Sequence, residues 1–258
     1  MIDIHSHLLP EIDDGADNID TTIEMIKIYK SQGVDKVIAT PHFYPSYFEN
    51  TRDVIKREVE KVNILLKEKN IDFTILPGSE VYATRDTLLD LKEGRIQTLN
   101  DSRYILMEFD YRRFPDYGFD LIYEIGLLGY RVVVAHPERY HYVIKDITFL
   151  NKLIDEGCLI QINSSSLTGV FGKDVKKTAL RIAENGSFNF LATDAHTQNI
   201  RGPHFEDALK ILNKLKKDYY QTLSYNAEML IKNVEICSEL NKIKEKRSIF
   251  NIFRATKL

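Results

Sequence analysis

Met1-Ile2-Asp3-Ile4-His5-Ser6-His7 opens the sequence, and this stretch decides the expected fold. Residues i and i+2 of a β-strand project to the same face, so a short apolar strand that ends in His-x-His presents two imidazoles together. Two histidines on one face are costly to pack and well suited to bind a metal ion. The stretch therefore predicts a buried strand with a pair of ligands at its carboxyl end.

Acidic and imidazole side chains recur along the chain in the same setting. Nearly every one directly follows an apolar run that is rich in β-branched residues. The later motifs are Asp13-Asp14, Thr40-Pro41-His42, Gly78-Ser79-Glu80, Met107-Glu108, Ala135-His136-Pro137 and Thr193-Asp194-Ala195-His196. This recurrence predicts that functional side chains collect at strand ends.

Short strands and amphipathic helices alternate along the chain. The predicted strands cover residues 1–5, 34–40, 72–77, 104–108, 131–135, 159–163 and 188–193. The predicted helices cover residues 19–32, 51–69, 116–128, 146–156, 172–184 and 203–216. Strands separated by helices imply repeated right-handed crossovers and a parallel sheet.

The placement of the polar motifs favours a closed barrel over an open sheet. An open sheet concentrates functional residues near one switch point, whereas a barrel gathers them from the ends of many strands. Here they follow six of the seven predicted strands. The sequence therefore predicts an α/β fold, a seven-stranded barrel with its active site at the C-terminal ends of the strands. Residues 81–100 are expected to form an insertion with one short helix.

Size and composition exclude several classes of protein. Of the 258 residues, 43% are hydrophobic and 10% aromatic, which indicates a substantial core, and the net charge of −3 argues against a nucleic-acid binder. Two cysteines, Cys158 and Cys237, with neither an export signal nor an apolar run of roughly 20 residues, predict a cytoplasmic protein. We expect one barrel domain over residues 1–240 and a basic, aromatic tail over residues 241–258.

Nine imidazoles and carboxylates are candidate metal ligands. They are His5, His7, Asp14, His42, Glu80, Glu108, His136, Asp194 and His196. Each alone has an ordinary explanation, such as a hydrogen-bonded histidine or, for Asp14 before Gly15, a turn. Together at one barrel mouth the carboxylates would repel one another, and divalent cations remove that repulsion. Oxygen and imidazole ligands without a thiolate favour Mn, Fe or Zn.

These motifs resemble the polymerase and histidinol phosphatase (PHP) superfamily. Within it, the opening residues 1–16 and the segment His136-Pro137-Glu138-Arg139-Tyr140 are similar to the bacterial CpsB/CapC tyrosine phosphatases of capsule and exopolysaccharide synthesis. The resemblance extends from residue 1 to about residue 233. It implies a distorted (β/α)7 barrel of the PHP type and three divalent metal ions, most often manganese.

The resemblance also implies how the ligands are shared. His5, His7, Glu80 and Asp194 would hold one metal, Glu80 would join Glu108 and His136 around a second, and Asp14, His42 and His196 would hold a third. Asp14 departs from the wider superfamily, where His is common, and agrees with the tyrosine phosphatase branch. Four carboxylates against three divalent cations leave a charge of about +2, which suits a phosphate dianion attacked by a metal-bridging hydroxide.

Two arginines are expected to act on the substrate. Arg139 and Arg201 follow His136 and His196 on loops that leave the ligand-bearing strands, and a guanidinium matches phosphoryl oxygens bidentately. The resemblance places phosphate-binding arginines at both points, so we assign them catalytic and substrate-binding roles. Arg112 and Arg113 are weaker candidates. The aromatic segment 43–48 is expected either to wall the pocket around a phenyl ring or to pack on the barrel rim.

Other hydrolytic mechanisms fit the sequence poorly. Cysteine-dependent tyrosine phosphatases carry Arg six residues after the nucleophile, but Ser164 follows Cys158 and Ile243 follows Cys237 at that offset. A Gly-x-Ser-x-Gly elbow is also absent from the sequence. The alternatives that stay open are a small-molecule phosphatase of the histidinol phosphatase type, a metal-dependent nuclease, and a scaffold that keeps its ligands without activity.

The resemblance suggests the partner. It implies a phosphotyrosine protein, an autophosphorylating bacterial tyrosine kinase that controls polysaccharide export, and no nucleic acid. The tail is expected to close the barrel bottom, and the alternative is weak contact with an anionic membrane surface through its basic and aromatic residues. The sequence does not determine the oligomeric state.

Overall fold

The computed structural model describes residues 1–236 and 240–244. Its strands are β1 (Ile2–Ser6), β2 (Lys36–Ala39), β3 (His42–Tyr44), β4 (Phe48–Glu49), β5 (Thr74–Pro77), β6 (Glu80–Tyr82), β7 (Tyr104–Glu108), β8 (Arg131–Val134), β9 (Leu159–Asn163) and β10 (Phe190–Ala192). Each of the seven predicted strands is present. The short strands β3, β4 and β6 were not predicted.

The strands form a distorted seven-stranded barrel, which confirms the predicted fold. One sheet has the order β1-β2-β5 and the other β10-β9-β8-β7-β6-β3-β4, with β3 and β4 antiparallel. The first and last strands meet where the His7 amide donates to the Ala195 carbonyl at 2.8 Å and the Asp194 amide to the His5 carbonyl at 2.9 Å. These bonds connect the two ends of the chain of strands.

The distortion lies in the second and third barrel strands, each of which is broken in two. Ala39 pairs with Pro77 before the break and His42 pairs with Glu80 after it, so the register continues from β2/β5 into β3/β6. Pro41 lies within one break and cannot donate a ladder hydrogen bond. Gly78 lies within the other, where a Cβ atom would approach Ile38 Cγ2 to 2.6 Å. The second halves of both strands therefore begin at candidate ligands.

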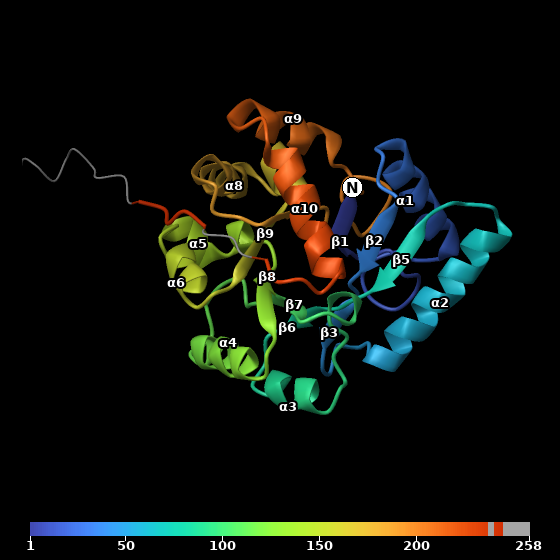
Figure 1. Ribbon diagram of the computed structural model, residues 1–258, viewed down its shortest axis with the longest axis horizontal. Coiled ribbons are helices and arrows are strands. Elements are labelled where there is room, and N and C mark those ends of the chain that lie inside the picture. Colours follow the sequence, from blue (N-terminus) through green and yellow to red (C-terminus); the bar gives the residue numbers. More distant parts are fainter. Residues whose placement is uncertain (237–239, 245–258) are drawn as a thin grey trace, which may run out of the picture.

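Helices surround the barrel (Figure 1). They are α1 (Ile19–Ser31), α2 (Arg52–Glu68), α3 (Thr87–Lys92), α4 (Gly118–Leu127), α5 (His141–Lys145), α6 (Phe149–Asp155), α7 (Ser164–Thr168), α8 (Lys173–Asn185), α9 (Glu206–Leu215) and α10 (Tyr219–Ile231), with 3₁₀ turns η1 (Leu99–Asp101) and η2 (Pro137–Arg139). All six predicted helices are present, and α3 is the short helix expected within residues 81–100. The helices α5, α7 and α10 were not predicted.

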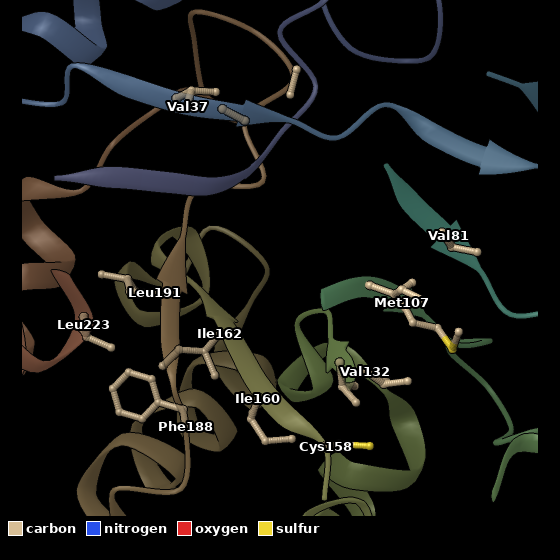
Figure 2. Packing of buried hydrophobic residues seen from close by; sticks show 14 of the residues in the cluster. Val37, Val81, Met107, Val132, Cys158, Ile160, Ile162, Phe188, Leu191 and Leu223 are labelled. Carbon is tan, nitrogen blue, oxygen red and sulfur yellow. The ribbon is translucent and has the colours of Figure 1, made fainter. Parts of the chain in front are cut away.

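The core has two layers. Inside the barrel, Tyr104, Leu159 and Phe190 pack with Leu230 of α10, which covers the N-terminal ends of the strands. Between the barrel and the outer helices lies a second cluster that includes the labelled side chains of Figure 2, such as Val37, Met107 and Ile160. Of the side chains of β9 that face the barrel interior, the first, Leu159, is apolar, and the next two toward the carboxyl end, Gln161 and Asn163, are polar. The apolar interior thus gives way to a polar one.

The last described residues pack on this barrel. Ile243 is buried, and its backbone exchanges two hydrogen bonds with the Asn151 side chain. The expected division at residue 240 and the role of the tail stay predictions, because residues 245–258 and Cys237 lie outside the described residues. Within residues 1–236 and 240–244, no helix is long and apolar enough to cross a membrane.

Candidate metal centre

A cavity of about 240 Å3 opens at the carboxyl ends of the barrel strands. It is lined by Asp14, His42, Glu80, Glu108, Tyr111, His136, Arg139, Asp194, His196 and Arg201. His5 and His7 lie beneath these residues with no exposed surface and contact both Glu80 and Asp194. The structure therefore brings all nine candidate ligands and both candidate arginines to one place.

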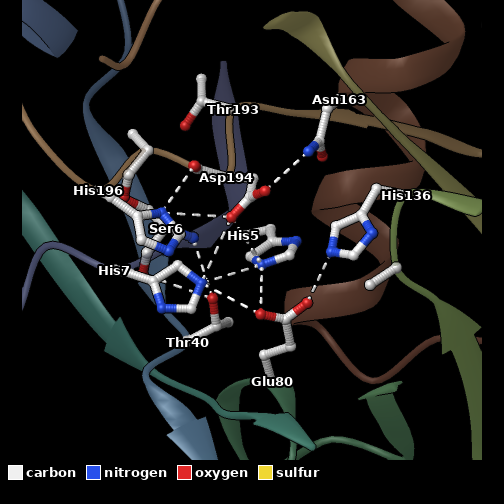
Figure 3. A network of polar contacts seen from close by, with 12 residues as sticks. His5, Ser6, His7, Thr40, Glu80, His136, Asn163, Thr193, Asp194 and His196 are labelled. Carbon is white, nitrogen blue, oxygen red and sulfur yellow. Dashed lines mark hydrogen bonds and ion pairs between the residues drawn. The ribbon is translucent and has the colours of Figure 1, made fainter. Parts of the chain in front are cut away.

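The most buried group joins three parts of the chain (Figure 3). His5 Nε2 and His7 Nε2 lie 3.2 Å apart, and each is 3.2 Å from Glu80 Oε2 and 3.5 Å from Asp194 Oδ1. The register of β1 against β2 shifts between Asp3 and Ser6. This irregularity turns His5 into the barrel although Ile4, the preceding residue, also packs in the interior cluster.

A chain of amide hydrogen bonds fixes the tautomer of His5. Asn163 Nδ2 donates to Asp194 Oδ2 at 2.8 Å, Gln161 Nε2 donates to Asn163 Oδ1 at 2.7 Å, and Gln161 Oε1 lies 3.0 Å from His5 Nδ1. Because the carboxylate accepts only, each amide in turn must present its oxygen to the next donor. His5 Nδ1 therefore carries the proton, and His5 Nε2 presents its lone pair to the group.

Asp13 fixes His7 in the same way. Its Oδ2 atom accepts from His7 Nδ1 at 2.7 Å and from the His42 amide at 3.0 Å, while Oδ1 accepts from the Gly15 amide at 2.9 Å. His7 Nδ1 is thus the protonated nitrogen. Partners of this kind set the tautomer and the ring orientation of histidines that bind metals.

Burial lowers the pKa of His5 and His7, but the neighbouring carboxylates raise both above the usual value, so the group attracts a positive charge. With both imidazoles neutral, as metal ligands must be, the arrangement has four acceptors and no donor between them. The lone pairs of two imidazoles and two carboxylate oxygens face one another at 3.2 to 3.5 Å. Two atoms that each lie about 2.1 Å from one metal are roughly 3.0–3.5 Å apart in octahedral or tetrahedral coordination. The spacing and chemistry of these residues therefore fit a divalent cation.

Two further groups lie beside the first. One contains His7, Asp14, His42 and His196, and the other contains His42, Glu80 and Glu108, with the ligand atoms of each group within 4.8 Å of one another. His136 Nε2 lies 2.9 Å from Glu80 Oε1 and 3.5 Å from Glu108 Oε1. Glu80 thus stands at the junction of all the groups, and the described side chains contain clusters able to bind metal ions.

Two ligand candidates have backbone conformations that are rare outside glycine. His136 has a φ of 31° and Asp194 a φ of 52°, both in the left-handed region. Such residues cluster at functional sites, where the surrounding structure holds the backbone in place. Here each conformation occurs directly after a barrel strand and turns the side chain into the cavity.

The environment of the centre shifts the pKa values of Glu108 and Glu80 in opposite directions. Burial and the nearby Glu80 carboxylate raise the pKa of Glu108 to about 7. Burial would also raise the pKa of Glu80, but His5 and His136 hold it well below its usual range. Burial and Arg139 lower the pKa of His136 to about 4, so its imidazole stays neutral. The cluster favours a positive charge placed among its oxygens.

Arg139 and Arg201 enclose the cavity from one side. Arg139 Nη1 donates to Asp194 Oδ2 at 2.7 Å, and its guanidinium lies over Tyr111 and Phe171 with Cζ at 5.0 and 4.3 Å from the ring centroids. Arg201 Nη2 lies 3.0 Å from His196 Nε2. Within the described part of the chain, the buried Arg201 Nε atom has no hydrogen-bond partner.

Other sequence candidates lie elsewhere. Arg113 is exposed and pairs with Asp116, and neither it nor Arg112 lines the cavity. Burial raises the pKa of the Cys158 thiol to about 12, which is unsuited to a nucleophile. Residues 164–166 form the start of helix α7 and are not in the lining of the cavity.

The aromatic segment 43–48 is divided between two environments. Phe43 is buried in the outer core cluster, and Phe48 stacks on the ring of His42 with centroids 5.7 Å apart. Tyr44 stacks between Tyr47 and Tyr82, with centroids at 4.5 and 4.1 Å. Within the described residues, none of the segment's rings lines the cavity, so it packs on the barrel rim.

Sequence reasoning missed the residues that orient the ligands. Asp13 precedes the candidate ligand Asp14, and Gln161 and Asn163 lie within a predicted strand, but local sequence assigns none of the three a role at the centre. The signal available was two amides at alternate positions of an otherwise apolar strand. Phe171, which contacts Arg139, carries no such signal.

The fold and the cavity define a class: barrel proteins whose strand ends carry imidazoles and carboxylates able to bind metal ions. Comparison with known proteins specifies the group within that class. The family described as capsular polysaccharide synthesis, CpsB/CapC, matches residues 1–232, and the chain belongs to this family.

Relatives of the chain carry consistent names. Tyrosine-protein phosphatase YwqE from Bacillus subtilis is 35% identical over 98% of this chain and 100% of that protein. Tyrosine-protein phosphatase CpsB from Streptococcus pneumoniae is 34% identical over 83% of this chain and 90% of that protein. A crystal structure described with YwqE and CpsB as unique metal-dependent tyrosine phosphatases has a TM-score of 0.90 and 36% identity, over 95% of this chain and 100% of that one.

Proposed function

We propose that this chain is a metal-dependent phosphatase that hydrolyses phosphotyrosine in proteins. The observation that carries the proposal is the convergence of four ligand atoms, from His5, His7, Glu80 and Asp194, at distances of 3.2 to 3.5 Å. Two arginines stand at the edge of the same cavity. Family membership and the names of the relatives support the same reaction.

Three divalent cations, most often manganese and otherwise iron or zinc, would occupy the centre. The first would be held by His5, His7, Glu80 and Asp194, the second by Glu80, Glu108 and His136, and the third by Asp14, His42 and His196. Divalent cations in such a site lower the pKa of water to supply a nucleophile and neutralise phosphoryl charge. The mixed oxygen and imidazole donors suit these metals.

The residues of the chain would position the phosphoryl group. Arg139 and Arg201 face the centre from one side, and their guanidinium groups match two phosphoryl oxygens each. The rings of Tyr111 and Phe171 hold Arg139 in place between them. The leaving group is a phenolate of unperturbed pKa about 10, which needs less protonation than an alkoxide.

The natural substrate would be an autophosphorylating bacterial tyrosine kinase that controls capsule or exopolysaccharide synthesis. The family description and the relatives' names support this assignment. A cytoplasmic location would follow from such a partner. Residues 1–240 would carry the activity.

Parallel kinetics on two substrates test the proposal. A phosphotyrosine peptide should be hydrolysed with a much higher kcat/KM than histidinol phosphate, and single-stranded DNA should not be degraded. A chelator should abolish turnover and Mn²⁺ should restore it, whereas thiol alkylation should leave turnover intact because Cys158 is buried with a raised pKa. A higher kcat/KM for histidinol phosphate would overturn the assignment.

A further inference from the structure

Basic side chains line a groove outside the metal centre. Along helix α8, a hollow of about 380 Å3 is lined by Lys173, Lys176, Lys177, Leu180, Arg181 and Glu184. Lys173, Lys177 and Arg181 stand four residues apart and so share one helix face. We call this hollow the α8 groove.

The lining of the α8 groove contains four cations and one carboxylate, so the groove is locally positive. The whole chain has a net charge of −3. Some surface lysines elsewhere form ion pairs, such as Lys210 with Glu206 and Lys242 with Asp155, whereas isolated ones such as Lys214 and Lys217 are not gathered in a hollow with other cations. Among residues 1–236 and 240–244, no carboxylate lies within ion-pairing distance of the four cations of the groove. Glu184, at the far end, is the acidic residue in the lining.

The groove begins beside the catalytic cavity. Phe171 lies two residues before Lys173, and its ring contacts the guanidinium of Arg139, with Arg201 Cζ at 6.0 Å. Lys176 Nζ donates to the Thr168 carbonyl at 3.2 Å, which ties the first turn of α8 to the loop that carries Phe171. Phe171 therefore stands between the cavity and the first residues of the groove, although it is in the lining of neither.

The groove also continues at its other end. Arg181 and Glu184 line a second hollow of about 220 Å3 together with Asn185, Ile243 and Lys244. Eight residues of α-helix span about 12 Å, and an extended peptide covers that length with roughly four residues. A polypeptide with its phosphotyrosine in the cavity would thus place several neighbouring residues along the groove.

We propose that the α8 groove binds an acidic segment of the substrate polypeptide that flanks the phosphotyrosine; this inference rests on the proposed function. Charge complementarity and the position of the groove close to the cavity select this occupant. The chain's own C-terminal residues 246–258 contain Lys and Arg and no acidic residue, so their charge makes them unsuitable for the same groove. Acidic flanking residues would raise the rate of encounter and the affinity of the substrate.

Matched peptides test the inference. Two pairs of phosphotyrosine peptides are compared. Within each pair, one peptide carries three Glu and the other three Gln, between three and six residues from the phosphotyrosine. These residues lie on the amino side in one pair and on the carboxyl side in the other. In one of the two pairs, kcat/KM for the Glu peptide should be roughly three- to tenfold higher than for the Gln peptide at low ionic strength. The preference should shrink at 0.5 M salt, about the range where exposed charges are screened.

Variants of the groove provide the second arm. Lys177→Ala/Arg181→Ala should bring the ratio of the two kcat/KM values close to one, while p-nitrophenyl phosphate turnover stays at the wild-type level. Lys177→Glu should favour a peptide with Lys at the same positions, a reversal that misfolding does not produce. Lys214→Ala/Lys217→Ala, two exposed lysines at the end of α9, is the matched control and should keep the wild-type ratio.

The outcomes separate the two proposals. Equal kcat/KM for Glu and Gln peptides, or a preference that persists in Lys177→Ala/Arg181→Ala, overturns the groove inference while the phosphatase assignment stands. A second result would also overturn the groove inference: the protein sediments with phosphatidylserine vesicles in a way that depends on Lys177 and Arg181, but shows no preference between the peptides. The groove would then bind a lipid surface and not a polypeptide. Failure of the wild type on every phosphotyrosine substrate would remove the proposed function itself.

Discussion

Asp13 connects two candidate ligands through one carboxylate. Three donors, His7 Nδ1 and the amides of His42 and Gly15, share its two oxygens. The side chain is buried and lies outside the cavity lining. At the scale of single residues, such a partner decides which ring nitrogen of His7 faces the centre.

Replacing Asp13 with Asn should weaken metal binding. The amide keeps the size of the side chain but removes its charge and one acceptor, so His7 loses its fixed tautomer. We expect about a 10- to 100-fold loss of Mn²⁺ affinity, measured by competition with a fluorescent chelator. Asp17→Asn, at an exposed position nearby, is the control. Equal affinities for both variants would show that Asp13 does not orient His7.

Arg139 should act on the substrate and not on the metals. In Arg139→Ala the ligand set remains complete, so metal content measured by mass spectrometry should stay at the wild-type level. The loss of the guanidinium should lower kcat/KM for a phosphotyrosine peptide roughly 100-fold. Arg139→Lys should recover part of the lost kcat/KM, because lysine restores the positive charge but not the bidentate geometry of the guanidinium.

Arg113→Ala serves as the comparison for Arg139, because Arg113 is exposed and pairs with Asp116. Its kinetics should match those of the wild type. Unchanged kinetics in Arg139→Ala would remove Arg139 from the site, and a large loss in Arg113→Ala would move the substrate contact to the loop after β7.

At the scale of elements, the breaks in the second and third barrel strands determine where His42 and Glu80 lie. Both residues begin a second strand half and pair with each other in parallel register. The break between β5 and β6 is narrow, since a Cβ atom on Gly78 would meet Ile38, Leu99 and Thr40 at 2.6, 3.0 and 3.2 Å. Close packing at the break therefore sets the position of Glu80, two residues away.

Gly78→Ala tests this packing. The added methyl group has no space, and overpacking of this kind typically costs about 1–3 kcal/mol of unfolding free energy. Metal affinity should fall as well because Glu80 must shift. Both quantities are measurable, by urea denaturation and by chelator competition.

Gly126→Ala is the matched control for Gly78→Ala. A Cβ atom on Gly126, within helix α4, would meet nothing within 4 Å. This variant should gain about 0.5–1 kcal/mol from the reduced backbone entropy of the unfolded chain. If both substitutions changed stability equally, close packing at the break would not be the reason for a glycine at position 78.

At the scale of the whole molecule, the centre joins strands from both sheets and from both ends of the chain. Its nine side chains come from or follow β1, β2, β5, β7, β8 and β10. A cation bound among them would hold these strands together, and its removal would leave buried carboxylates facing one another. Metal binding and barrel stability are therefore expected to be coupled.

Thermal unfolding with and without a chelator checks this coupling. The melting temperature should fall when metal is removed and rise again with increasing Mn²⁺ concentration. His136→Ala should weaken the Mn²⁺-dependent rise and abolish turnover, whereas His141→Ala, an exposed histidine five residues later, should keep both. A melting temperature that does not respond to the chelator would contradict the proposed centre.

The sequence alone determined the alternation of strands and helices and the identity of the candidate ligands. Both are local properties: apolar periodicity marks the elements, and polar residues such as His5 and Glu108 interrupt it at strand ends. The similarity of the motifs to a known family supplied the expected distortion of the barrel. Bounds such as those of β7 and β9 agree with the prediction to the residue.

Only the tertiary structure decided how these residues act together. The chain from Asp194 through Asn163 and Gln161 to His5 links three strands that lie far apart in sequence. The breaks before His42 and Glu80 depend on the pairing of two strands. The position of the α8 groove close to the cavity depends on the contact between Phe171 and Arg139. Hydrogen-bond direction and close packing are properties of neighbours in space, so no reading of local periodicity contains them.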